Sequence, residues 1–295
     1  MKRTWAVVVA AAALVVSACG SKEDLSGSNQ PAEAGGEVVV GSADFTENKI
    51  LAEIYAGALK ATGAKVSVKS GIGARELVVK ALQDKSLGVV PEYSGNLLNY
   101  FDKTNTKAES EEVYAALKSK TPSGLEVLAK SAAEDKDVLV VTKATADSGV
   151  KSIADLGSGK YALGAAGEWA QRWEAKVKEL YGVSFTEIKT TDAGGPVTVD
   201  ALKNGTVQVA NLYTTSADIK VNDFVELDDP KTMYPAQNVV PLLRSDAVDA
   251  KGKAALDKVS AALTTEKLAD LVKRVDVDKE TIANVAADFL KGVSL

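Results

Sequence analysis

Short apolar runs alternate with amphipathic segments along this chain from Glu37 to its end, and this alternation limits the possible folds more than any other feature. The runs have the length of strands, and the segments between them carry apolar residues at helical spacing. The pattern is typical of α/β proteins with largely parallel sheets. The expected strands are residues 37–41, 65–69, 87–90, 138–141, 161–165, 206–212 and 238–243.

Two lobes are expected from the order of these segments. The charged turn at residues 134–137 precedes a buried strand and marks a crossing into a second lobe, and the helical C-terminal stretch returns to the first. We predict that residues 37–139 with 238–295 form lobe I and that residues 140–237 form lobe II. A ligand is then expected in the cleft between the lobes, where strand ends and helix N-termini meet.

The first residues have the composition of an export signal. Lys2 and Arg3 precede an apolar run from Trp5 to Val16, and small residues follow it. The run of 12 residues is shorter than the roughly 20 that cross a bilayer as a helix, while its charged start and small-residue exit are typical of a signal peptide. We predict that residues 1–18 are a lipoprotein signal peptide.

Cys19 directly follows this signal and is the only cysteine of the chain. It is expected either to receive a lipid or to remain a free thiol after ordinary cleavage, and the reactivity of an exposed unpaired thiol favours the lipid. Residues 19–36, rich in Ser, Gly, Glu and Asn, then form a lipid anchor and flexible tether. The predicted location is extracytoplasmic, anchored to the cell membrane by the lipid.

Composition excludes several classes of function. Loss of Lys2 and Arg3 with the leader takes the net charge from −5 to −7, which argues against a nucleic-acid partner because phosphate binding needs a basic face. The chain has no histidine, the commonest general base and metal ligand. With Cys19 committed to lipid, cysteine nucleophiles and Cys/His zinc sites are excluded as well. We therefore expect no catalytic residues, metal or cofactor.

The first strand-to-helix junction, from Ser42 to Glu47, is a candidate anion site. The hydroxyl groups of Ser42 and Thr46 and the free N–H groups of a helix start would hold a carboxylate. Alternatively, Asp44 and Thr46 only cap the helix, because their spacing to Glu47 is that of a capping box.

Two other junctions place a tyrosine directly after a strand. Tyr93 is followed by Ser94 and Asn96, and Tyr213 by Thr214. A tyrosine offers an aromatic face to a cation and a hydroxyl group for hydrogen bonding. The alternative is a plain turn in which the ring covers the edge of the core.

Glu168, Trp169 and Arg172 open the long helix of the second lobe. Glu168 and Trp169 either face the cleft or, for Trp169, join an apolar stripe with Trp173. Arg172 either binds across the cleft or to a ligand carboxylate, or forms a surface ion pair.

In this order and spacing, the segments resemble the substrate-binding proteins of bacterial ABC importers for glycine betaine, choline, carnitine and related compatible solutes. The resemblance runs from about Val38 to the C-terminus. The segments that carry it are residues 40–48, 91–95, 167–169 with Arg172, 213–215, 228–231 and 238–241.

The resemblance implies a type II periplasmic-binding-protein fold whose hinged lobes close on a quaternary ammonium group held in a cage of aromatic rings. Tyr93 and Tyr213 match two cage positions, whereas Asp137 and Val199 stand where tyrosines are expected. If Asp137 faces the cleft, it favours a net cation such as choline over a zwitterion such as glycine betaine; a solvated loop charge is the alternative. Trp169 would supply a missing wall.

The chain is thus predicted to be the extracytoplasmic substrate-binding component of an ABC importer for glycine betaine, choline or a related quaternary amine. It would act as a monomer that delivers its ligand to a permease and an ATPase. The same fold with another amine or amino-acid-like solute is an alternative. A secreted carboxylate-dependent enzyme is an alternative of another class, and the sequence has no nucleophile elbow or phosphate loop to support it. The predicted ligand-binding residues are Ser42, Phe45, Thr46, Tyr93, Ser94, Asn96, Asp137, Glu168, Trp169, Arg172, Tyr213 and Thr214.

Overall fold

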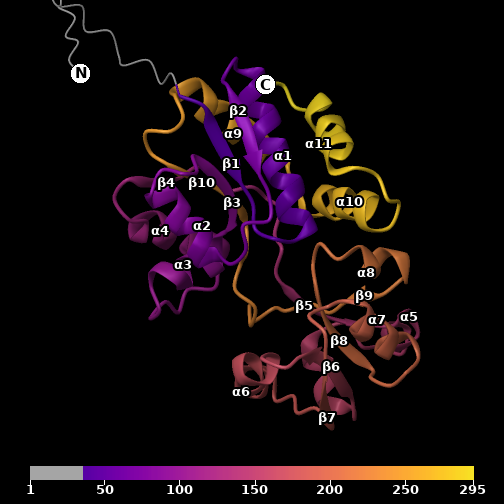
Figure 1. The fold of residues 1–295 in the computed structure, drawn as a ribbon. Helices are drawn as coiled ribbons and strands as arrows, with labels where there is room; N and C mark the ends of the chain where they lie inside the picture. The colour runs from indigo at the N-terminus through magenta and orange to yellow at the C-terminus, as the bar shows by residue number, and fades with distance from the viewer. Residues whose placement is uncertain (1–35) are drawn as a thin grey trace, which may run out of the picture. The chain divides into compact units, whose positions relative to one another are not determined.

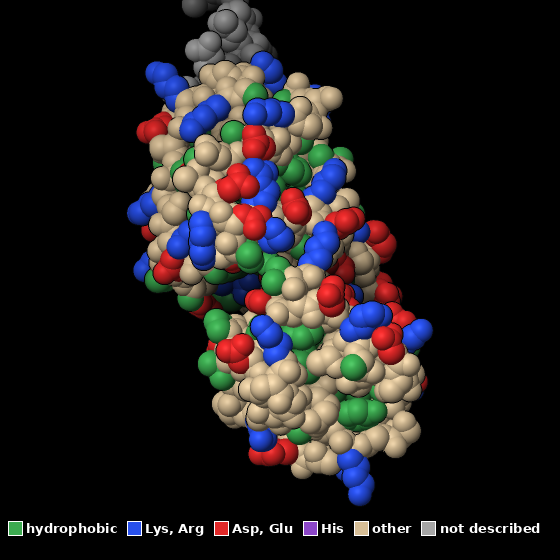
Figure 2. Space-filling view, turned by 90° about the vertical axis from the view of Figure 1, so that its right-hand side faces the viewer, with side chains coloured by type: hydrophobic (Ala, Val, Ile, Leu, Met, Phe, Trp, Pro, Cys, Tyr) green, Lys and Arg blue, Asp and Glu red, His purple; other side chains and the backbone are tan. Residues whose placement is uncertain are grey.

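The computed structural model of the chain describes residues 36–295. The predicted signal peptide, Cys19 and nearly all of the tether lie outside these residues. None of the described helices combines the length and apolarity needed to cross a membrane. The described residues belong to one compact unit, and on the face seen in Figure 2 basic and acidic side chains are interspersed.

Two five-stranded sheets organise this unit (Figure 1). We call each sheet with the helices packed on it a lobe. The strands of the lobe I sheet, in spatial order, are β2 (Val66–Lys69), β1 (Val38–Gly41), β3 (Val89–Tyr93), β10 (Val239–Arg244) and β4 (Leu125–Val127). β1 runs parallel to β2 and β3, whereas β10 runs antiparallel to β3 and β4.

The sheet of lobe II has the same kind of mixed order. Its strands are β7 (Glu187–Thr191), β6 (Ala162–Ala166), β8 (Val209–Tyr213), β5 (Asp137–Val141) and β9 (Val225–Glu226). β6 runs parallel to β7 and β8, and β5 runs antiparallel to β8 and β9.

The expected largely parallel sheets are therefore corrected to mixed ones, and the reason is the path of the chain. β5 and β10 are the strands by which the chain enters each lobe from the other. Each starts beside the last residue of a neighbouring strand, so that Val239 lies opposite Tyr93 and Asp137 opposite Tyr213. A strand that begins at that edge must run against the others.

All seven expected strands are present, and β4, β7 and β9 were missed because they are short or polar edge strands. All of β5 pairs within the second sheet, so the chain leaves lobe I before Asp137, ahead of the expected boundary between residues 139 and 140.

Seven helices accompany the first sheet. They are α1 (Thr46–Ala61), α2 (Arg75–Gln83), α3 (Ser94–Phe101), α4 (Ser110–Lys120), α9 (Ala250–Ala262), α10 (Thr265–Asp276) and α11 (Ile282–Lys291). The last three pack on α1, which buries ten of its residues (Figure 1). The C-terminal stretch thus packs on the first helix of lobe I.

The helices of lobe II are shorter. They are α5 (Lys143–Asp147), α6 (Ala175–Tyr181), α7 (Pro196–Lys203) and α8 (Ala217–Val221), with a 3-10 turn at Ile153–Ser158 and a π-helical turn at Ala170–Glu174. Their apolar side chains form two clusters, one on each face of the sheet strands.

Two chain segments join the lobes, and they pair with each other. Glu134 and Asn238 form an isolated antiparallel bridge, and the N–H group of Asp135 donates to the carbonyl oxygen of Gln237 over 3.2 Å. The hydroxyl group of Thr214, just after β8, donates to the carbonyl oxygen of Glu134 over 2.7 Å. We call residues 134–136 and 235–238 the crossing segments.

Candidate functional site

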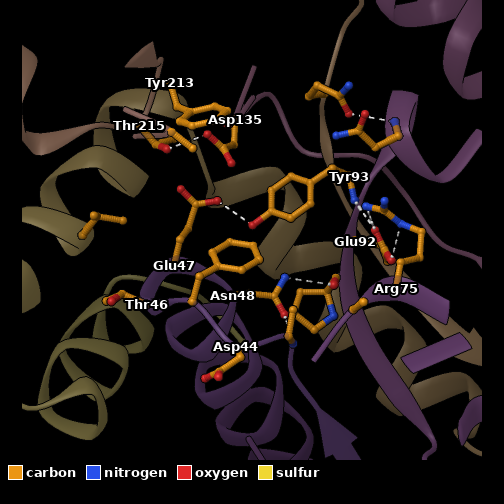
Figure 3. Close-up of a pocket in the computed structure, with 18 of the residues that line it drawn as sticks. Asp44, Thr46, Glu47, Asn48, Arg75, Glu92, Tyr93, Asp135, Tyr213 and Thr215 are labelled. Carbon is orange, nitrogen blue, oxygen red and sulfur yellow. Dashed lines mark hydrogen bonds and ion pairs between the residues drawn. The ribbon is translucent and has the colours of Figure 1, made fainter. Parts of the chain in front are cut away.

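A cavity of about 810 Å³ is lined by residues of both lobes and of the crossing segments (Figure 3). The start of α1, the end of β3 and the end of α10 contribute from lobe I, and the end of β8 with the loop before α7 contributes from lobe II. The edge of each sheet at which the chain crosses therefore faces this cavity.

Tyr93 and Glu47 form a buried polar contact of the cavity. Tyr93 is the last residue of β3, and its hydroxyl group donates to Oε1 of Glu47, in the first turn of α1, over 2.6 Å. Both side chains are buried. The ring of Phe45 stacks on that of Tyr93 with centroids 6.1 Å apart and is itself 43% exposed, so it presents an aromatic face to the cavity rim.

Asp135, on the first crossing segment, is a second buried carboxyl group of the cavity. Its Oδ1 accepts from the hydroxyl group of Thr215 over 2.9 Å. Burial raises the pKa of Asp135 to about 6. Burial, and next the neighbouring Asp135, raise the pKa of Glu47 to about 8. Two carboxyl groups that are costly to ionise thus share one wall of the cavity.

Asp137 and Tyr213 lie opposite each other where β5 begins and β8 ends. Burial raises the pKa of Asp137, and Arg172, whose Nη2 is 4.0 Å from its Oδ2, opposes this. Burial and the neighbouring Asp137 raise the pKa of Tyr213 to about 12. Asp137 therefore faces the cavity and is not a solvated loop charge.

Arg75 is the only basic residue among the described residues that line the cavity. Its Nε and Nη2 donate to the two oxygens of Glu92 over 2.8 Å each. Glu92 also accepts from the N–H group of Tyr93 over 3.0 Å. The positive charge of Arg75 is thus already matched by a bidentate partner.

The lining as a whole is acidic. Its carboxyl groups belong to Asp44, Glu47, Glu92, Asp135, Asp137 and Asp276. Such a lining, with rings from Phe45, Tyr93 and Tyr213, can hold a diffuse cation through ring quadrupoles and negative charge. Within residues 36–295 no cluster of three or more side chains suited to a metal ion is present.

Six predicted site residues lie together on the cavity wall. They are Phe45, Thr46, Tyr93, Asn96, Asp137 and Tyr213. Neither Asp44 nor Thr46 caps α1, because no side chain accepts from its first N–H groups and Asp44 pairs with Lys49 over 2.7 Å. Asn48 holds the junction instead, since its Oδ1 accepts from the N–H group of Ala43.

Three predicted hydroxyl groups support the backbone near the cavity but do not line it. Ser42 is fully buried and accepts from the N–H group of Gly71 over 3.0 Å. Ser94 accepts from the N–H group of Asn238 over 3.0 Å, and Thr214 binds the first crossing segment as described above. Each of them fixes a loop that carries a lining residue, and none of the three is itself a lining residue.

Trp169 does not form a wall of the cleft. It is 2% exposed in the core of lobe II, and its Nε1 donates to the hydroxyl group of Tyr234 over 2.9 Å. Glu168 is exposed and outside the lining. The side chain of Arg172 is 47% exposed and reaches the site only through Asp137. Val199 packs in the core against the sheet of lobe II.

The residues that sequence reasoning missed are Glu47, Asp135, Thr215 and the Arg75–Glu92 pair. The sequence pattern indicates a capping role for Glu47, whereas the structure buries its side chain against the hydroxyl group of Tyr93. Asp135 lies in a charged turn that has the composition of a surface loop. Only the pairing of the crossing segments brings it to the cavity.

The fold and the sequence place this chain among known transport proteins. Residues 36–292 match the family described as "Substrate binding domain of ABC-type glycine betaine transport system". The chain is 28% identical over 271 residues, 85% of its length and 86% of the relative, to the glycine-betaine-binding protein of Pseudomonas aeruginosa. It is 27% identical over 291 residues, 92% of its length and 95% of the relative, to the glycine betaine-binding protein YehZ of Escherichia coli.

Solved structures agree in fold. The structure described as a glycine betaine/carnitine/choline ABC transporter superposes with a TM-score of 0.80 at 19% identity, over 86% of this chain and 97% of that one. Ligand-free YehZ from Escherichia coli superposes with a TM-score of 0.74 at 26% identity, over 86% of this chain and 98% of that one. With its two lobes and a match along almost all described residues, the chain belongs to the family of substrate-binding domains of ABC-type glycine betaine transport systems.

Proposed function

We propose that the cargo of this ABC substrate-binding protein is a quaternary amine with a net positive charge, for which choline is the representative. The observation that carries the proposal is the combination of three aromatic rings with the carboxyl groups of Glu47, Asp135 and Asp137 around one cavity. A trimethylammonium group has no N–H to donate, so rings and negative charge are the groups that recognise it.

The charge balance of the lining favours a cation over a zwitterion. A betaine would bring its own carboxylate beside Asp135 and Asp137, where like charges repel. Arg75, the basic lining residue, already holds Glu92 through two hydrogen bonds. Choline has no carboxylate and meets neither difficulty.

Glycine betaine is the second candidate, and one observation favours it. The half-exposed guanidinium group of Arg172 lies 4.0 Å from Asp137 at the edge of the cavity, where it could turn from Asp137 to a ligand carboxylate. The curated relatives named above are described as glycine betaine-binding proteins.

The test is isothermal titration calorimetry of the chain from Gly20 onward with choline, glycine betaine and carnitine. Amino acids and sugars serve as controls. We expect choline to bind at least about tenfold more tightly than glycine betaine, a difference of about 1.4 kcal/mol. Tighter binding of glycine betaine would reject the cation proposal, and binding of an amino acid alone would reject the quaternary-amine cargo.

We also propose that the protein works as a membrane-anchored monomer. As the substrate-binding component of an ABC transporter it acts outside the cytoplasm and is not an enzyme; the anchor rests on the signal pattern and on Cys19. The permease and its ATPase are the expected partners. Expression with a labelled fatty acid should mark the wild-type protein and leave Cys19→Ala unlabelled and released from membranes; label on both would reject Cys19 as the anchor.

A further inference from the structure

We infer that the carboxyl groups of Glu47 and Asp135 hold one proton when no cation is bound, and that a cationic ligand displaces this proton to solvent. The inference rests on the proposed cationic cargo. On this inference Glu47 is a specificity-determining residue. Its carboxyl group is neutral in the free protein and becomes negatively charged when a cationic ligand is bound. The O–H bond of a carboxylic acid breaks, the proton passes to the buffer, and the ligand cation balances the carboxylate left behind.

The carboxyl groups of Glu47 and Asp135 lie on one wall of the cavity without a basic partner. Glu47 is 5% exposed and accepts from the hydroxyl group of Tyr93, while Asp135 accepts from that of Thr215. Figure 3 places both carboxyl groups on the same side of the Tyr93 ring. Among residues 36–295 neither carboxyl group forms an ion pair; the nearby Lys136 and Arg172 pair with Glu134 and Asp137 instead.

Other charged and titratable groups line the cavity or lie next to its lining residues. The acidic and phenolic groups are Asp44, Glu92, Tyr93, Glu134, Asp137, Glu168, Tyr213 and Asp276; the basic groups are Lys49, Arg75, Lys136 and Arg172. Each of the four basic groups already has a carboxylate partner, on Asp44, Glu92, Glu134 and Asp137 respectively.

The pairing of every basic group leaves a proton as the counter-charge for the buried acids. Ionising both Glu47 and Asp135 would leave two negative charges in a site screened from water, which is costly without a cation. A quaternary amine against the rings of Phe45 and Tyr93 would supply that cation. Proton loss from the pair and cation binding should therefore favour each other.

The raised pKa values of Glu47 and Asp135 determine how the affinity for a cation changes with pH. Since burial raises the pKa of Glu47 to about 8 and that of Asp135 to about 6, the free protein carries the proton near neutrality. Ligand binding then has to release it, so affinity for a cation should rise as pH rises from about 6 to about 8, by up to about tenfold per pH unit. Above that range the site is already ionised and the dependence should level off.

Calorimetric titration with choline at pH 7, in buffers with different heats of protonation, counts the protons released. We expect close to one proton per choline for the wild-type protein and close to none for Glu47→Gln, which should still bind, about tenfold more weakly. Asp147→Asn is the matched control, because Asp147 is an exposed carboxylate on α5 paired with Lys143, and it should release as many protons as the wild type.

The outcomes separate this inference from the proposed function. Choline binding without proton release, or with an affinity independent of pH between 6 and 8, would overturn the inference alone. Absence of choline binding would overturn the proposed cargo and the inference with it. The pH dependence of the wild-type protein decides the matter even if Glu47→Gln does not fold.

Discussion

At the scale of single residues, the site depends on Tyr93 in two separate ways. Its ring stacks with Phe45 and its hydroxyl group donates to Glu47. Tyr93→Ala should weaken choline binding by at least about tenfold, because the cation loses a ring worth up to about 2 kcal/mol when desolvated. Tyr93→Phe keeps the ring and should lose less. Calorimetry on both variants checks the order, and equal losses would contradict a role for the ring.

Arg172 separates the two candidate cargoes. Its guanidinium group contributes to the site only through Asp137. Arg172→Ala should leave choline affinity unchanged or raise it by up to about threefold, since removal of a positive charge leaves the cavity more negative. Glycine betaine, if it binds, should bind more weakly. A marked loss of choline affinity in competition binding would show that Arg172 supports the cation site after all.

At the scale of elements, α3 and the second crossing segment touch at Gly95. A Cβ atom there would lie 2.5 Å from the carbonyl oxygen of Ala236 and 3.0 Å from Nε2 of Gln237. Backbone blocks the first contact, so a side chain at this position must displace the crossing segment or the helix.

Gly95→Ala should therefore destabilise the protein by about 1–3 kcal/mol, although alanine in a helix is intrinsically favoured by about 1 kcal/mol. Gly157→Ala is the control, because a Cβ atom there meets nothing closer than 3.8 Å. Urea denaturation of both variants measures the difference. If Gly95→Ala is as stable as the control, the close packing of α3 on the crossing segment does not limit stability.

At the scale of the whole molecule, Glu47 makes stability depend on pH in an unusual direction. Burial raises the pKa of Glu47 from its ordinary value of 4.5 to about 8 in the folded protein, so the folded state binds more protons between these two values. Stability contributed by this group is present at low pH and is lost as pH rises through that window, by up to about 1.4 kcal/mol per pH unit. Glu47→Gln should remove this loss.

Urea denaturation of both proteins without ligand, at pH 5 and pH 8, provides the measurement. The expected result is a stability gain from Glu47→Gln that is larger at pH 8 than at pH 5. The same gain at both pH values would mean that Glu47 ionises in the folded protein near its ordinary pKa and that burial does not control it.

The sequence predicts the two-lobe fold well because apolar runs carry their own periodicity. It also predicts that Tyr93 and Tyr213 lie at the cavity, since each is the last residue of a strand. It could not predict that Trp169 lies in a core, because an apolar stripe and a cleft wall have the same spacing. Nor could it predict that Asp135 lies near Glu47, because this depends on how the two crossing segments, which are distant in the sequence, pair with each other.

The place of β10 in the first sheet has a consequence for how the protein is made. β10 lies between β3 and β4, although it follows the whole of lobe II in the chain. The sheet of lobe I therefore lacks the strand between β3 and β4 until the chain is available up to Arg244. A chain that becomes available from its N-terminus onward therefore has all the strands of lobe II before the sheet of lobe I is complete.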